Sequence, residues 1–287
     1  MRRLSGGKES VRFQILARQF ALPSTVTMIA LFYVPLLIIL AYSLLTRGPY
    51  GGVMLPVSLE SYRRVFDPLY GQIFWRSIWI AAVSTALCLI LAFPLAFYIA
   101  RSGGRKTLLL NLVMLPFWTS FLIRTYAWMF LLRDTGLINT ALLAVHAIRE
   151  PLPLLFNDGA VILGLVYGYL PFMVLPLYAT LEKLDDSLLQ AAADLGATPW
   201  VAFWRVVIPL SKPGAVAGSL LVFIPCLGAY LTPDLMGGGK TVMIGNLVQN
   251  QFTTARDWPF GAAFSLLLML IVLGTTRVLG KRGEELL

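Results

Sequence analysis

Residues 183–213 read KLDDSLLQAAADLGATPWVAFWRVVIPLSKP, a stretch rich in helix caps and breakers between two long apolar segments. Asp185 is a good N-terminal helix cap, and residues 188–195 favour a helix because they include three consecutive alanines. Gly196 stands where a glycine in the left-handed conformation commonly ends a helix. Pro199 follows at a position typical of the first turn of a new helix. The stretch therefore predicts a short helix, a sharp glycine turn and a second helix.

The second helix of this stretch has an apolar face that includes Phe203 and Trp204. We expect Pro209 to end this helix and Pro213 to open the next long apolar segment. The small residues of the first helix would let another protein approach its backbone closely. An ordinary connecting helix on a membrane surface would have the same local sequence, so the residues of the stretch leave both interpretations open.

Six long apolar segments make up most of the chain around this stretch. Of the 287 residues, 58% are hydrophobic and only 13% are charged, and the mean hydropathy is +0.77. A helix of about 20 apolar residues crosses the hydrocarbon of a bilayer, where every backbone polar group must be paired. We therefore predict an all-α integral membrane protein with transmembrane helices at about 23–46, 75–100, 107–132, 159–181, 213–233 and 258–277.

The distribution of Lys and Arg predicts the orientation of these helices. The side that holds both termini carries 14 Lys and Arg residues, against 8 on the other side. An excess of basic residues marks the cytoplasmic side of a membrane protein. We therefore expect a cytoplasmic segment 1–22, a transmembrane domain 23–280 with the cytoplasmic loop 183–212, and a cytoplasmic tail 281–287. The same clustering accounts for the net charge of +9 without a nucleic-acid partner.

Two features depart from six plain spans. Arg124 is a charge inside the third predicted span, and such a charge is a functional hypothesis by default. We expect it to form an ion pair or to act as a gate. Residues 135–145 are apolar but too few to cross a bilayer, so they suit a short interfacial or re-entrant helix.

No residue pattern of an enzyme or a metal protein is present. His146 is the only histidine, and Cys88 and Cys226 lie in separate apolar runs, so we expect no metal and no cofactor. Residues 237–241, GGGKT, look like the end of a phosphate-binding loop, but Asp234 stands where the motif needs glycine. The chain therefore needs a partner or an ion gradient to supply energy for any transport.

The spacing within the opening stretch resembles the signature of bacterial ABC importer permeases, which reads Glu-Ala-Ala, three residues, Gly, nine residues and Ile-x-Leu-Pro. The matching positions run from Gln190 to Pro209, with Gln190 in place of the leading glutamate. In that family the segment is the coupling helix, which sits in a groove of a separate ATPase subunit. The resemblance implies that the 186–209 loop couples to the ATPase. The contact residues that it implies are Gln190, Ala191, Ala192, Asp194, Leu195, Gly196 and Ala197.

Three further segments, 115–139, 228–238 and 244–263, look like the spermidine/putrescine branch of these permeases, a pattern that opine and other small-cation importers share. The resemblance implies a type I permease in the bacterial inner membrane that forms half of a translocation pathway and is not itself an enzyme. It implies four kinds of partner: two ATP-binding ABC subunits, a second homologous permease, an extracytoplasmic substrate-binding protein and membrane lipid.

Candidate residues for the substrate path are those whose side chains can bind an organic cation. Aromatic faces attract alkylammonium groups by about 0.5–2 kcal/mol each, and a diamine favours carboxylates at its ends. Asp234, just beyond the fifth predicted span, is the acid that we favour. The aromatic candidates are Trp118, Tyr126, Tyr167, Tyr169, Phe223 and Tyr230.

An ion-coupled carrier or channel is the alternative to an ATP-driven importer. Carriers place ionisable groups or broken helices near the midplane, often in repeated halves. This chain has proline- and glycine-interrupted spans, but Arg124 is the only charge inside one, and the two halves show no repeat. The residues therefore favour the importer subunit.

Overall fold

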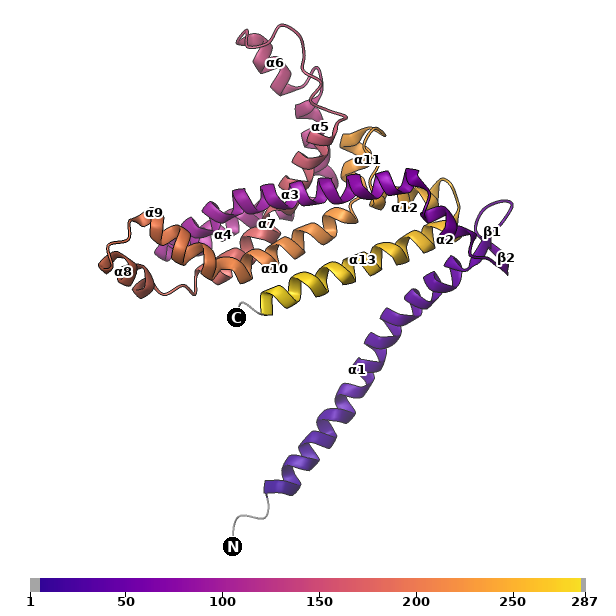
Figure 1. Cartoon of the computed structure of the whole chain (residues 1–287), viewed down its shortest axis with the longest axis horizontal. Coiled ribbons are helices and arrows are strands. Elements are labelled where there is room, and N and C mark those ends of the chain that lie inside the picture. Colours follow the sequence, from indigo (N-terminus) through magenta and orange to yellow (C-terminus); the bar gives the residue numbers. More distant parts are fainter. Residues whose placement is uncertain (1–5, 285–287) are drawn as a thin grey trace.

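The computed structural model describes the backbone of residues 6–284 and the side chains of residues 22–277. Most of its long helices form one bundle, and a helical arm that ends in α6 stands away from the bundle (Figure 1). Residues 1–5 of the expected N-terminal segment and residues 285–287 of the expected tail lie outside this description. The described chain is the helical membrane architecture that the sequence predicts.

The centre of the bundle consists of α3 (Pro68–Ala100), α7 (Asp158–Leu181) and α10 (Ile208–Leu227), each of which packs against the other two. Small residues allow these helices to approach closely, as is common between membrane helices. At Gly218 of α10, a Cβ atom would lie 2.7 Å from Sδ of Met173 on α7. A larger residue at this position would push the two helices apart.

The two outermost long helices, α1 (Gly6–Ser43) and α13 (Trp258–Glu284), pack against each other. The apolar part of α1, Leu22–Ser43, has none of its most hydrophobic window buried within the chain. Water cannot solvate such a surface favourably, so lipid or another hydrophobic partner must cover it. Five helices are long and apolar enough to cross a membrane, and a sixth crossing is counted if one bent helix pair forms a single span.

That bent pair is the third predicted span, and the expectation of one continuous helix over 107–132 is wrong. The chain forms α4 (Lys106–Met114) and the 3₁₀ turn η2 (Leu115–Trp118), and after a break it forms α5 (Phe121–Leu132), with a bend of 85°. Thr119 at the break has extended backbone angles, and its Oγ1 donates to the Pro116 carbonyl at 2.7 Å. This side-chain bond competes with the helical hydrogen bonds.

The arm continues from α5 into α6 (Leu137–Ala144), which confirms a short helix within the apolar segment 135–145. Asn139 is fully buried and exchanges two hydrogen bonds with the backbone of Leu152, both 2.9 Å long. These bonds fix the return path of the chain from the arm to α7. The arm is therefore a defined element of the fold.

The fifth predicted span differs at both ends from the expected 213–233. Pro209 does not end the preceding helix, because α9 (Pro199–Ala202) and the π-helical turn η3 (Phe203–Val207) run directly into α10. Pro209 has no N–H to donate, so it interrupts the regular helical hydrogen bonds. The chain stays helical because η3 is a wider π turn, in which the Ile208 N–H donates to the carbonyl five residues before it. The helix then ends at Leu227, and α11 (Leu231–Gly237) begins after a break of three residues.

The end of the bundle opposite α8 (Asp186–Asp194) and α9 is covered by short elements (Figure 1). They are the antiparallel strands β1 (Leu45–Arg47) and β2 (Val53–Val57) and the helices α2 (Glu60–Val65) and α12 (Ile244–Thr253). The strands are an addition to the predicted all-α fold. The sequence predicts that this end faces outward.

Ion pairs and a turn connect this end to the core of the bundle. Arg64 of α2 pairs with the buried Asp257 at 2.8 Å, and Arg76 of α3 pairs with Asp158 of α7 at 2.5 Å. Arg76 also donates to the Lys240 carbonyl at 2.8 Å, and Thr241 donates to Asp158 at 2.5 Å. The GGGKT segment is therefore a turn that closes onto α3 and α7.

Candidate functional site

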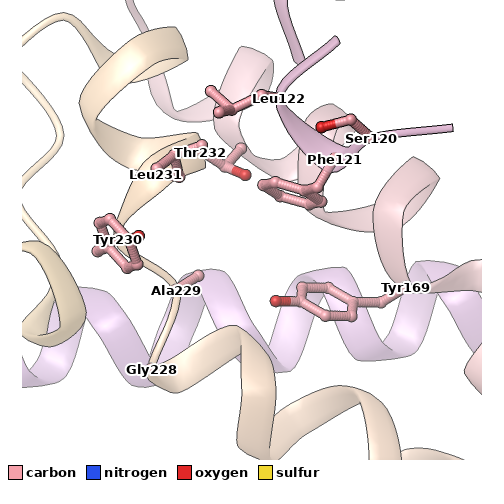
Figure 2. Close-up of a pocket in the computed structure, with 9 residues that line it drawn as sticks. All are labelled: Ser120, Phe121, Leu122, Tyr169, Gly228, Ala229, Tyr230, Leu231 and Thr232. Atoms are coloured by element: carbon pink, nitrogen blue, oxygen red, sulfur yellow. The ribbon is translucent and has the colours of Figure 1, made fainter. Parts of the chain in front are cut away.

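The two broken spans face each other across a cavity of about 400 Å³. One wall is the start of α5, another is α7, and the third is the break between α10 and α11 (Figure 2). Irregular backbone at membrane depth is tolerated where it lines such a cavity. The residues that line it are Ser120, Phe121, Leu122, Tyr169, Gly228, Ala229, Tyr230, Leu231 and Thr232.

The cavity offers hydroxyl groups and aromatic rings but no carboxylate. Thr232 is only 1% exposed, and its Oγ1 has no hydrogen-bond partner among the described residues. The hydroxyl of Tyr169 points across the cavity toward the α10–α11 break (Figure 2). A buried hydroxyl without a partner is costly, so it suits a site that a polar ligand completes.

The end of α10 adds a partial charge to this wall. Gly228 caps α10, and its N–H donates to the carbonyls of Ile224 and Cys226. The carboxyl end of a helix carries a partial negative charge that favours cations. Together with the ring of Tyr230, this helix end makes the wall suitable for an ammonium group.

The structure brings two of the predicted path residues, Tyr169 and Tyr230, together at this cavity. Trp118 is 77% exposed on η2, and Phe223 packs against the core of the bundle. Asp234 is exposed on α11 and accepts a hydrogen bond from Asn246 at 2.9 Å.

One of the remaining two aromatic candidates, Tyr126, lies on α5, and the other, Tyr167 of α7, contacts it. Tyr167 makes an edge-to-face contact with Trp128, with 5.5 Å between the ring centroids. Tyr126 lies in a separate cavity with Met129 and Phe130. Five of the seven predicted path residues therefore lie outside the cavity between the broken spans.

Sequence reasoning missed the two polar residues Ser120 and Thr232 of the cavity, and also the ring of Phe121. A signal for the first break exists in the pair Thr119–Ser120, which follows Pro116 by three residues. No local signal indicates that this break faces the one after Leu227, because that contact joins distant parts of the chain.

The second candidate site is the loop that contains α8, at the opposite end of the bundle from α12 (Figure 1). Asp185 caps α8 by accepting the Ser187 N–H at 2.9 Å, and this bond holds the pKa of the Asp185 carboxyl below its ordinary value. At the other end, Gly196 has a φ of +80° and donates to the Ala193 carbonyl at 2.8 Å, while Ala197 donates to Ala192 at 2.9 Å.

These last two bonds form the Schellman motif that ends many helices in a left-handed glycine. Thr198 then caps α9, whose first residue is Pro199, by accepting the Val201 N–H at 3.4 Å. The predicted helix, glycine turn and second helix are therefore all confirmed.

The predicted coupling residues form an exposed face of this loop. Gln190, Ala191 and Asp194 are exposed, and Leu195 is 89% exposed, which is unusual for a leucine. Ala192, Gly196 and Ala197 line an adjoining groove of about 410 Å³ together with residues of α9. Such a face, with an apolar knob beside a groove, suits contact with another protein.

Two ion pairs lie where this loop meets the membrane helices. Asp186 of α8 pairs with Arg101, which follows α3, so a force on α8 would reach α3. Glu182, which caps the end of α7 just before the loop, pairs with Lys106 of α4 at 3.3 Å. This second pair joins α7 to the helix that leads to the break bordering the cavity.

Comparisons with known proteins agree with this architecture. Residues 11–280 match the family model described as "Binding-protein-dependent transport system inner membrane component". The spermidine/putrescine transport system permease protein PotB of Escherichia coli strain K12 is 43% identical over 260 residues, which cover 88% of this chain and 94% of that protein. PotB of Haemophilus influenzae is 42% identical over 240 residues, which cover 83% and 84%.

Among solved structures, a bacterial alginate ABC transporter in complex with a periplasmic protein contains a chain that superposes with a TM-score of 0.77. That chain is 14% identical, and the match covers 94% of both chains. The inward-facing MetNI methionine ABC transporter has a chain that superposes with a TM-score of 0.57 at 18% identity, over 78% of this chain and 98% of that chain. The fold is thus that of an ABC importer permease. The chain belongs to the binding-protein-dependent transport system inner membrane component family, as a multi-pass permease subunit of an importer and not an enzyme.

Proposed function

We propose that this permease subunit carries polyamines such as spermidine and putrescine, or a related small organic cation, through the cavity between α5, α7 and the α10–α11 break. The observation that supports this most directly is the meeting of two broken spans at aromatic rings, hydroxyls and the carboxyl end of α10. An ammonium group would donate to the hydroxyls and lie against the rings. The names of the two relatives support the same substrate class.

The chemistry of the cavity also supports a second, homologous permease subunit. A polyamine carries several positive charges, and desolvating them requires negative partners. The nine residues that line the cavity include no carboxylate. We propose that the second subunit completes the path and supplies the acidic groups, while an extracytoplasmic binding protein delivers the substrate.

Energy would come from two ATP-binding subunits docked on the 186–209 loop. The exposed Leu195 and the groove beside Gly196 would contact them, and the pair between Asp186 and Arg101 would pass the movement of α8 to α3. ATP-driven closure of the two subunits would thereby alternate the access of the cavity between the two sides of the membrane.

Uptake by the complete transporter in proteoliposomes tests the substrate and its site. Radiolabelled spermidine should be taken up only with ATP inside, and excess putrescine should compete. Thr232→Val keeps the side-chain volume but removes the orphan hydroxyl, and it should raise the KM about fivefold, as expected for one lost hydrogen bond. An unchanged KM in Thr232→Val would remove this cavity from the path, and uptake without ATP would favour the ion-coupled carrier.

Purification in mild detergent tests the partners. We expect two ATP-binding subunits and a second six-span permease to accompany this chain when it is isolated from its native membranes and analysed by mass spectrometry. Recovery of this chain alone, in a preparation where other complexes survive, would contradict the proposed assembly.

A further inference from the structure

Arg124 is a buried cation on α5, and the transport path proposed above gives it no role. The residue is 9% exposed, and its Nε and Nη1 atoms have no hydrogen-bond partner among the described residues. None of the four ion pairs found in the described part of the chain includes it. The expected ion pair is therefore not formed within these residues, and a charge at this depth requires another form of compensation.

Two aromatic rings supply that compensation. The guanidinium carbon of Arg124 lies 4.9 Å from the ring centroid of Phe117 and 5.7 Å from that of Phe121. Cations at these distances are attracted to the face of an aromatic ring. Phe117 lies before the break at Thr119–Ser120 and Phe121 lies after it. The guanidinium thus contacts both sides of the 85° bend.

Both rings also belong to the surroundings of the cavity. Phe121 lines the cavity and lies against α7 at Gly168, where a Cβ atom would approach the ring to 3.2 Å. Phe117 meets Phe172 edge to face, with 5.0 Å between centroids, and Phe172 lies 6.1 Å from Tyr169 of the cavity. A change at the bend would therefore move two walls of the cavity.

We propose that Arg124 is a positioning residue that latches the bend of the third span and holds Phe121 in place as a wall of the cavity. Its effect on transport rests on the proposed function of the cavity, whereas the latch itself is a property of the bend. Arginine suits this role because its planar guanidinium stacks on aromatic faces and is weakly hydrated. Lysine would keep the charge but lose the planar contact.

A distance measured across the bend tests the latch without reference to the substrate. Spin labels would be placed at two exposed positions, Leu108 on α4 and Ala127 on α5, in the complete transporter in lipid nanodiscs. We expect one narrow distance distribution in the parent, a broad one in Arg124→Met and an intermediate one in Arg124→Lys. Arg133→Met is the matched control, because Arg133 also lies over a ring, 5.3 Å from Phe130, but away from the bend.

Uptake kinetics test the consequence for the cavity. Arg124→Met should raise the KM about tenfold, the size expected for the loss of its cation–π contacts, while Vmax changes less than about twofold. Arg124→Lys should restore part of the affinity. Phe117→Leu removes one of the two ring contacts, so its effect should be smaller than that of Arg124→Met. The double variant should be no worse than Arg124→Met, because Arg124→Met already removes the contact with Phe117.

Three results would bear on the inference in different ways. If both Arg124→Met and Phe117→Leu keep the narrow distance distribution of the parent, the latch is overturned. If Arg124→Met does not assemble, the distance distribution of Phe117→Leu alone decides whether the latch exists. A broad distance with an unchanged KM would overturn the role in positioning the cavity wall. Failure of spermidine to be transported at all would overturn the proposed substrate and leave the distance test valid.

Discussion

The loop around Gly196 and the break at Thr119–Ser120 both interrupt a helix, but they differ in what makes the interruption. At Gly196 the turn is encoded locally, by a φ of +80° that favours glycine and by two short hydrogen bonds within six residues. At Thr119 and Ser120 the backbone is extended, which any residue allows. The Thr119 hydroxyl competes with the helical hydrogen bonds there, and contacts from Arg124 to the rings of Phe117 and Phe121 span the bend.

This difference fits the roles proposed for the two regions. A coupling element has to transmit force, so a turn that its own residues impose keeps α8 and α9 in a fixed relation. A cavity wall has to change between two states, and contacts between distant segments can be exchanged at little cost in local strain. A substitution that breaks the turn of the loop should therefore abolish coupling, whereas substitutions around the cavity should lower the affinity for substrate by degrees.

The largest effect is expected for Gly196→Pro. Proline fixes φ at about −65° and has no N–H, whereas this position needs a φ of +80° and donates to the Ala193 carbonyl. We expect uptake to fall by at least about tenfold while membrane insertion and ATP hydrolysis persist, since the turn lies outside the membrane helices. Uptake and ATP hydrolysis measured on the same proteoliposomes would show the uncoupling.

Gly196→Ala is the control for that experiment. Alanine keeps the N–H, its Cβ would meet nothing within 4 Å, and its left-handed strain is only about 1–2 kcal/mol. Its loss of uptake should be much smaller. Normal uptake in Gly196→Pro would mean that the loop does not couple through its turn.

The next effect in size is expected for Tyr169→Ala at the cavity. Loss of one ring that contacts an ammonium group should raise the KM of uptake about fivefold to thirtyfold, with Vmax nearly unchanged. Tyr126→Ala is the matched control, because Tyr126 is a partly exposed tyrosine in a different cavity. Equal effects of the two substitutions would contradict the assignment of the path to the cavity between the broken spans.

The contrast between local turns and long-range contacts also explains how much of the fold could be predicted from the sequence. The cap at Asp185, the turn at Gly196 and the restart at Pro199 depend on neighbours within a few residues, and all three were predictable. The straight third span was predicted wrongly because apolar length says nothing about a bend. Composition also does not reveal that a single hydroxyl, that of Thr119, donates a hydrogen bond to a backbone carbonyl of the preceding helical turn.

The residues that line the cavity were harder to predict from the sequence than the bend. Tyr169 and Tyr230 were proposed for their chemistry, but the same criterion also selected Phe223, which packs in the core. Membership of the cavity depends on the meeting of α5, α7 and the α10–α11 break, and no residue pattern within one span specifies that contact. Thr232 had no distinguishing feature until its buried hydroxyl was seen without a partner.

A smaller effect is expected at the start of α8, the proposed coupling helix. Asp185→Ala removes the acceptor of the Ser187 N–H and frays the first turn of α8, so uptake per ATP hydrolysed should fall a few-fold. Asp185→Asn keeps a capping oxygen and should behave like the parent. Equal coupling in all three proteins would show that the start of α8 is not part of the rigid element.

The pH dependence of this cap follows from the lowered pKa of Asp185. A carboxyl group with a lowered pKa stabilises the capped state above its ordinary pKa, and that contribution is lost as the pH falls through the lowered value. Coupling through α8 should therefore be independent of pH near neutrality. A decline in uptake per ATP between pH 8 and 6 would have to arise from a different group.

The smallest effect is expected for Asp234→Asn, which tests where the cavity ends. Asp234 is exposed, bonded to Asn246 and absent from the cavity lining, yet it lies two residues after Thr232 on α11. At that place its charge can attract a polyamine to the mouth without contacting it in the bound state. We expect the KM of uptake to rise about twofold at low ionic strength, and the difference to vanish near 1 M salt, where the Debye length is only about 3 Å.

Asp134→Asn is the control for that experiment, since Asp134 is another exposed acid, on the arm that stands away from the bundle. It should leave the KM unchanged at every salt concentration. An increase of about tenfold in Asp234→Asn that persists at high salt would contradict long-range attraction, because screening barely affects a desolvated contact. The path would then include Asp234 as a direct ligand, and the cavity between the broken spans would have to extend along α11 when substrate is bound.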